Sequence, residues 1–117
     1  MKTLIALLAL TFSVNAYAGP KVVYSCISDT DLLVTFNANY GELSVMKKGG
    51  EVLVDADDGY DHMAGQLESF PPQPFVSVWH HEETEKVVLS LHAPTPFQPY
   101  TGTYVDFDGK SHNLNCL

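Results

Sequence analysis

The chain has 117 residues, including 14 acidic residues and six lysines but no arginine, and its formal net charge is −8. A surface this acidic repels phosphate backbones and anionic lipids, which argues against nucleic acid and membrane surfaces as partners. A basic protein or a cation would be attracted instead. The length suits one domain with a single hydrophobic core.

The N-terminus has the pattern of a secretory signal peptide. Lys2 precedes an apolar run over residues 4–14, and the small residues Ala16 and Ala18 follow. This arrangement predicts cleavage before Gly19, with residues 1–18 as the signal peptide and residues 19–117 as a single β-barrel-like domain. The apolar run is too short to span a bilayer. We therefore expect a secreted or periplasmic protein with no membrane span, whose net charge becomes −9 when Lys2 is removed.

The chain has two cysteines, Cys26 and Cys116, so one pairing is available. Small exported domains commonly rely on disulfides to supplement a limited core. The alternative, a reactive thiol pair, is disfavoured because the two residues are far apart and form no C-x-x-C motif. The predicted bond joins the first strand of the domain to the last.

Short runs of β-branched and aromatic residues alternate with turn residues along the domain, at roughly the 8–12-residue spacing typical of sandwiches and barrels. No run has the amphipathic spacing of a helix of normal length. Strands are expected at residues 22–27, 32–37, 42–47, 51–56, 75–81, 86–93, 100–107 and 110–116, with one irregular strand at residues 64–68.

The expected fold class is all-β, a small antiparallel meander of seven to eight strands in a closed or nearly closed barrel. A two-sheet sandwich is the alternative. Asp108-Gly109 predicts a type I′ turn in the last hairpin. In the hairpin of residues 75–93, alternation predicts two faces. One holds Phe75, Trp79, Leu89 and Leu91, and the other, partly covered, holds Val76, Val78, His80, Val88 and His92.

Few catalytic motifs are present. The sequence has no Gly-x-Ser-x-Gly nucleophile elbow and no glycine-rich phosphate loop. Because both cysteines are expected in the disulfide, no thiolate nucleophile remains. The five histidines are scattered, and His80 and His81 point to opposite faces of one strand. We therefore expect a protein that is not an enzyme and binds no cofactor.

The densest acidic segment carries Asp55, Asp57, Asp58 and Asp61 around Gly59. Calcium sites use several carboxylates on a loop with a glycine at the sharp turn. The glycine is one position too early for an EF-hand, and no glutamate stands at position twelve. A solvated turn is the simpler interpretation. An irregular Ca²⁺ site, or a small-molecule carrier using the barrel interior, is the alternative function.

Two proline–aromatic loops are the most distinctive feature. One spans residues 70–75 and carries Phe70, and the other spans residues 94–100 and carries Phe97 and Tyr100. They enter and leave the same hairpin, so both are expected at one end of the barrel, opposite the acidic turn of residues 82–85. Proline lowers the entropy lost on binding, and aromatic side chains dominate interface energetics. These rings either anchor a protein partner or plug the end of the barrel.

The strand Val23-Tyr24-Ser25-Cys26 resembles the Tyr-x-Cys start of bacterial periplasmic inhibitors of c-type lysozyme, which are small exported disulfide-bridged β-barrels. The inhibitory loop of that family carries a Ser-Gly-x-x-Tyr motif. This chain has Asp58-Gly59-Tyr60-Asp61 in the comparable region, without the serine and with the tyrosine displaced, so the resemblance carries over Gly59 and Tyr60 alone. It implies an exported non-catalytic protein that binds a basic cell-wall hydrolase.

Overall fold

The computed structural model describes residues 22–80, 86–94 and 99–117. The predicted signal peptide, the turn at residues 82–85 and Phe97 lie outside these residues. Within the described part of the chain, no helix is long and apolar enough to cross a membrane.

The described residues form nine antiparallel strands, whereas the sequence predicted seven to eight. Two strands have the expected bounds, and the others shift or shorten by one to three residues, apart from the irregular one. The strands are β1 Val23–Ser28, β2 Leu32–Asn37, β3 Glu42–Lys47, β4 Val52–Asp57, β5 Tyr60–Leu67, β6 Gln73–His80, β7 Val87–His92, β8 Thr101–Val105 and β9 Ser111–Cys116.

The irregular strand expected at residues 64–68 is instead the regular eight-residue β5. Its sequence, with Asp61, Ala64 and Gly65, has low β propensity. It pairs with β6 in unbroken register from Tyr60↔His80 to Leu67↔Gln73. Tertiary pairing with a good strand former therefore overrides the local preference.

All nine strands belong to one sheet with the order β4-β3-β2-β1-β9-β8-β7-β6-β5. This is a meander whose first and last strands pair, as the disulfide predicted. The sheet is not closed, however, because β4 and β5 are its two edges although they are consecutive in sequence. The prediction of a closed or nearly closed barrel is therefore wrong, and the sheet is a curled half-barrel.

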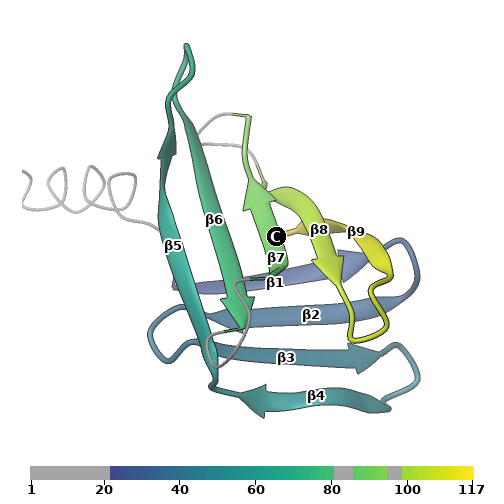
Figure 1. The fold of residues 1–117 in the computed structure, drawn as a ribbon. Coiled ribbons are helices and arrows are strands. Elements are labelled where there is room, and N and C mark those ends of the chain that lie inside the picture. Colours follow the sequence, from purple (N-terminus) through teal and green to yellow (C-terminus); the bar gives the residue numbers. More distant parts are fainter. Residues whose placement is uncertain (1–21, 81–85, 95–98) are drawn as a thin grey trace, which may run out of the picture.

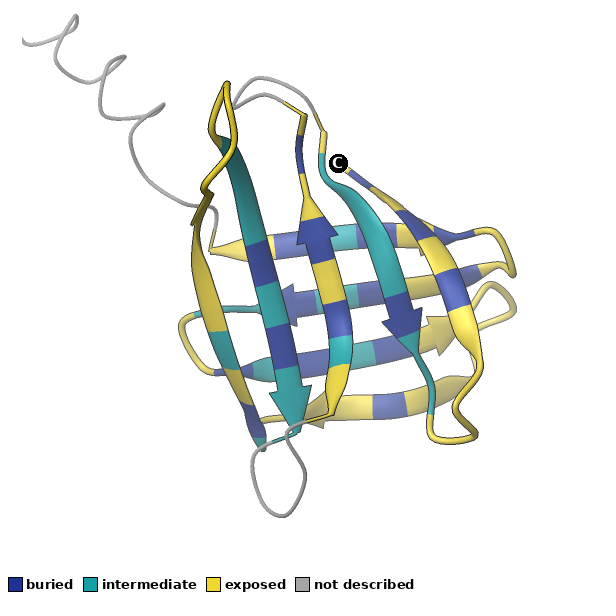
Figure 2. Ribbon diagram, turned by 45° about the horizontal axis from the view of Figure 1, so that its top comes forward, coloured by how far each residue is buried: buried dark blue, intermediate teal, exposed yellow. Residues whose placement is uncertain are grey.

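The curl brings the two halves of the sheet face to face. Strands β5–β9 lie across β1–β4 (Figure 1), and buried residues alternate with more exposed ones along the strands (Figure 2). Alternation supplies this core, because successive strand residues point to opposite faces. Its largest fully buried side chains are Tyr24, Phe36, Leu43, Leu89 and Leu91.

The two predicted faces of the β6–β7 hairpin are wrong. Val76 pairs with Leu91 and Val78 with Leu89, so the two valines and the two leucines share one face, and all four are buried. Phe75 and Trp79 are consequently on the outer face of the sheet, where they are half-buried. The error arises because alternation defines two faces in each strand but does not determine how the strands align.

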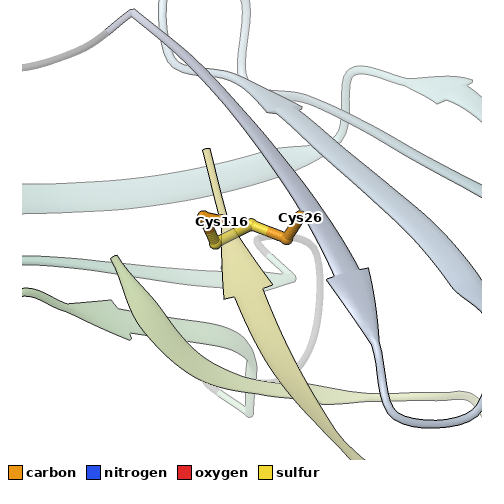
Figure 3. Close-up of a disulfide and its surroundings, with 2 residues drawn as sticks. All are labelled: Cys26 and Cys116. Carbon is orange, nitrogen blue, oxygen red and sulfur yellow. A yellow bond between two sulfur atoms is a disulfide. The ribbon is translucent and has the colours of Figure 1, made fainter. Parts of the chain in front are cut away.

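The β1–β9 seam closes the meander with three residue pairs, Cys26↔Cys116, Ile27↔Asn115 and Ser28↔Leu114. The predicted disulfide joins the first of these pairs across the two strands (Figure 3). Both cysteines are buried. The seam is therefore a short ladder reinforced by a covalent bond.

The Asp108-Gly109 turn differs from the predicted type I′. The amide of Asp106 donates to the carbonyl of Lys110, and Gly109 donates to the carbonyl of Asp106. The loop therefore has three residues, of which Gly109 alone has a positive φ, at 81°. This is the hairpin in which a tight turn ends on a left-handed glycine.

Candidate functional site

The β5–β6 hairpin projects beyond the body of the sheet (Figure 1). Its tip is the segment of residues 68–72, and Phe70 at the tip is fully exposed to solvent. The amide of Ser69 donates to the carbonyl of Leu67 at 2.8 Å, and the Ser69 hydroxyl donates to the carbonyl of Pro71 at 2.7 Å. Two prolines follow Phe70 and restrict the backbone. The tip thus presents one large aromatic ring on a constrained loop.

The outer face of the same hairpin continues this apolar surface. The residues on this face come from the pairs Leu67↔Gln73, Gly65↔Phe75, Met63↔Ser77 and Asp61↔Trp79. Met63 and Leu67 are 54% and 42% exposed, respectively, so β5 presents two large apolar side chains on this face. A Cβ on Gly65 would lie 3.4 Å from the Phe75 ring, so the glycine accommodates that ring in close contact.

We call Phe70, Leu67, Phe75, Met63 and Trp79 the hairpin face. Of these five residues, the sequence pattern identified Phe70 alone as an anchor. It missed Phe75 and Trp79 because it placed them in the core, and it missed Met63 and Leu67 because it expected an irregular segment there. These residues could be found only from the register between β5 and β6, which places them on one face.

Tyr100, another predicted anchor, packs against the core and is partly buried. Its ring lies edge-on to Tyr24 with 5.2 Å between ring centroids. Burial is the main reason that the pKa of Tyr24 rises to about 12, and it also raises the pKa of Tyr100. Tyr100 therefore closes one end of the core, which is the plug interpretation of the proline–aromatic loops.

The two proline–aromatic loops do begin at the same end of the sheet. The amide of Ala93 donates to the carbonyl of Pro74 at 3.1 Å, which ties the base of the second loop to the base of the first. Phe97 lies outside the described residues.

Gly59 and Tyr60 lie at the other end of β5. Tyr60 is buried, and its ring lies edge-on to His80. Burial, followed by the Asp57 charge, raises the pKa of Tyr60. The structure therefore does not bring these two residues together with Phe70, because the length of β5, about 25 Å for eight residues, separates them.

The acidic segment does not gather into an ion site. Asp57 accepts from the Gly59 amide at 3.2 Å, Asp55 is exposed on β4, and Asp61 is on β5 opposite Trp79. Across residues 22–80, 86–94 and 99–117, no three His, Cys, Asp or Glu side chains are placed to hold a metal ion. Asp55, Asp57, Asp58 and Asp61 instead make this edge of the molecule strongly negative.

A partly buried hydrogen-bond network lies at the β1–β2 turn, outside any predicted site. Asp106 Oδ2 accepts from His112 Nε2 at 2.9 Å, Thr30 Oγ1 bonds His112 Nδ1, and Ser28 Oγ lies 3.0 Å from Thr30 Oγ1. The His112 bond is the main cause of the lowered pKa of Asp106.

The order acid, imidazole and hydroxyl in this network matches that of a catalytic triad. The neighbouring backbone amides are already engaged, however. The amide of Asp29 donates to the Asn113 carbonyl, that of Asp31 donates to the Ser28 carbonyl, and those of Thr30 and Leu32 donate to Ser28 Oγ. These four amides therefore cannot stabilise an oxyanion, and the network acts as a polar staple between the β1–β2 and β8–β9 turns.

A hollow of about 300 Å³ lies at the end of the sheet away from Phe70. This volume is at the lower limit for small-molecule sites. It is lined by Tyr60, His80, Lys86, Val87, Val88, Val105, Asp106, Phe107 and Gly109.

The chain matches no protein-family model, no curated protein and no solved structure.

Proposed function

We propose that the protein is an exported, non-catalytic binding domain that engages a basic protein through the β5–β6 hairpin. The observation that carries the proposal is Phe70, a fully exposed aromatic side chain at the tip of a projecting, proline-constrained hairpin. A monomeric protein gains nothing in stability from such a side chain. In interfaces, aromatic residues seated in a partner's pocket dominate the binding energy.

The hairpin face supports the same proposal, because Met63 and Leu67 extend the apolar surface from the tip towards the base. The partner is inferred to be basic from charge. The mature chain has five lysines against 14 acidic residues, and such an imbalance accelerates association with a cationic protein. A c-type lysozyme is the most specific form of this proposal, and it rests on the resemblance of the first strand. In this form Phe70, rather than the buried Tyr60, is the residue that enters the partner's cleft.

The test is a titration of the mature domain with a basic c-type lysozyme at low salt, combined with a cell-wall lysis assay. We expect binding, slower lysis, and an affinity that falls as salt is added. Phe70→Ala is expected to weaken binding by about thirtyfold, because truncating a central aromatic anchor costs about 2 kcal/mol.

Phe107→Ala is the matched control, since Phe107 is also an exposed phenylalanine but lies in the β8–β9 turn. It is expected to leave the affinity unchanged. Equal losses in the two variants would show that Phe70 is not an anchor. An absence of binding at low salt would eliminate the lysozyme form of the proposal.

A further inference from the structure

The two free edges of the sheet differ in their protection against strand pairing. On β4, the register with β3 shifts twice, Ala56 has a φ of 43°, and aspartates stand at positions 55 and 57. Bulges and charges of this kind hinder the pairing of an edge strand with a further strand. On β5, the register with β6 is unbroken over eight residues, and Asp61 is the one formally charged residue. Among residues 22–80, 86–94 and 99–117, no strand pairs with the outer side of β5, so this edge is open to a further strand.

The backbone groups that face the free edge of β5 can be identified from one hydrogen bond. The carbonyl of Pro74 accepts from Ala93, so the polar groups of Pro74 face β7 and not β5. Gln66, directly opposite Pro74, therefore forms a pair without hydrogen bonds to β6, and its own amide and carbonyl point outwards. The alternation of the ladder extends this assignment to Ala64 and His62.

The β2–β3 turn covers the β5 edge at Tyr60, the end away from the hairpin tip. A Cβ on Gly41, in the β2–β3 turn, would lie 2.4 Å from the Tyr60 carbonyl oxygen, so that carbonyl faces the turn. This direction agrees with the alternation derived from Pro74. The usable edge therefore runs from His62 towards the tip, with Met63 and Leu67 exposed on the outer face beside it.

Charge decides what can pair with this edge. Residues 49–80 contain six acidic residues and no lysine or arginine. A second copy of the chain, paired antiparallel about Ala64, would bring two segments of the same negative charge together. The like charges of the two copies repel each other. A cationic strand has no such conflict.

We infer that the β5 edge accepts an extended, cationic segment of the partner protein as a tenth strand of the sheet. The inference rests on the proposed function for the basic character of the partner. Main-chain hydrogen bonds from Ala64 and Gln66 provide the alignment, and the exposed Met63 and Leu67 side chains contact alternate residues of the added strand, as in other cases of strand addition.

The test uses a synthetic peptide of alternating valine and threonine with a lysine at each end, and a matched peptide with glutamates in place of the lysines. Amide hydrogen exchange is followed residue by residue on the folded mature domain. The cationic peptide is expected to slow exchange at Ala64 and Gln66. The amide of Gly65, which already pairs with Phe75 on β6, is expected to be unaffected, and the acidic peptide is expected to bind more weakly.

Ala64→Pro removes one backbone N–H donor at the edge without removing a β5–β6 hydrogen bond. It is expected to lower the affinity for the cationic peptide by about tenfold. Ala64→Thr, which keeps the amide, is the control and is expected to bind like the wild type.

Unchanged exchange at Ala64 and Gln66 in the wild type would overturn the inference without any variant. Lysozyme binding that Ala64→Pro leaves intact would also overturn it, while the proposed function would stand. Protection of the edge by the peptide in a protein that binds no lysozyme supports the inference and counts against the lysozyme proposal alone.

Discussion

Removal of the Cys26–Cys116 disulfide is expected to cost this domain a large part of its stability. The bond closes a loop with a sequence separation of 90 residues. Loop-closure entropy for a loop of that length corresponds to about 4.6 kcal/mol at 25 °C, because the cross-link restricts the unfolded chain. Native domains are stable by about 5–15 kcal/mol in total, so the loss is about 30% of the stability or more.

The variant is Cys26→Ala/Cys116→Ala, which leaves no free thiol. The free energy of unfolding is measured by urea denaturation of the mature domain, with the reduced wild type as a second sample that lacks the bond but keeps both sulfur atoms. Both samples are expected to lose similar stability. A loss below about 1 kcal/mol in both would refute the entropic argument, since strain or residual structure would then offset it.

The seam itself gives a local readout of the same perturbation. Strands β1 and β9 share three residue pairs, whereas β5 and β6 share eight. Without the disulfide, amides of β9 are expected to exchange faster relative to those of β6, because the short ladder opens first. Uniform acceleration across the sheet would show that the seam does not depend on the bond once the domain is folded.

Two further predictions concern the sheet and the polar staple. Gly102→Ala is expected to destabilise the domain by about 1–3 kcal/mol in urea denaturation, because its Cβ would lie 1.8 Å from the Ser90 carbonyl oxygen. Gly49→Ala, where nothing lies within 4 Å, is the control, and similar losses in both would contradict the steric argument. The second prediction follows from the lowered pKa of Asp106, whose ordinary value is 3.8. Its contribution to stability is present above pH 3.8 and is lost as the pH falls through the lower pKa of the folded state, so Asp106→Asn is expected to show a smaller decline in stability upon acidification. Equal declines in the variant and the wild type would remove Asp106 as a source of acid sensitivity.

Much of the fold was predictable because its signals are local. Turn residues and β-branched runs placed eight of the nine strands to within a few residues. The two cysteines, having one available pairing, predicted the contact of the first strand with the last. The exception was β5, whose composition does not favour a strand and whose existence depends on pairing with β6.

The candidate site was predictable only in part. Phe70 could be identified because proline and aromatic residues cluster in its loop. Its neighbours on the hairpin face, Phe75 and Trp79, were assigned to the core, because the relative alignment of β6 and β7 is a tertiary property. Tyr100 and Tyr60 were candidates by composition, but Tyr60 is buried and Tyr100 is partly buried against the core.

The sequence by itself determined the β class, the acidic character and the pairing of Cys26 with Cys116, since these follow from residue types and their spacing along the chain. The tertiary structure decided which faces are buried, where the sheet stays open and which aromatic side chain meets solvent. Those properties depend on strand register and on the curl of the sheet. Both arise from contacts between residues far apart in the sequence, such as Gly41 with Tyr60 and Pro74 with Ala93.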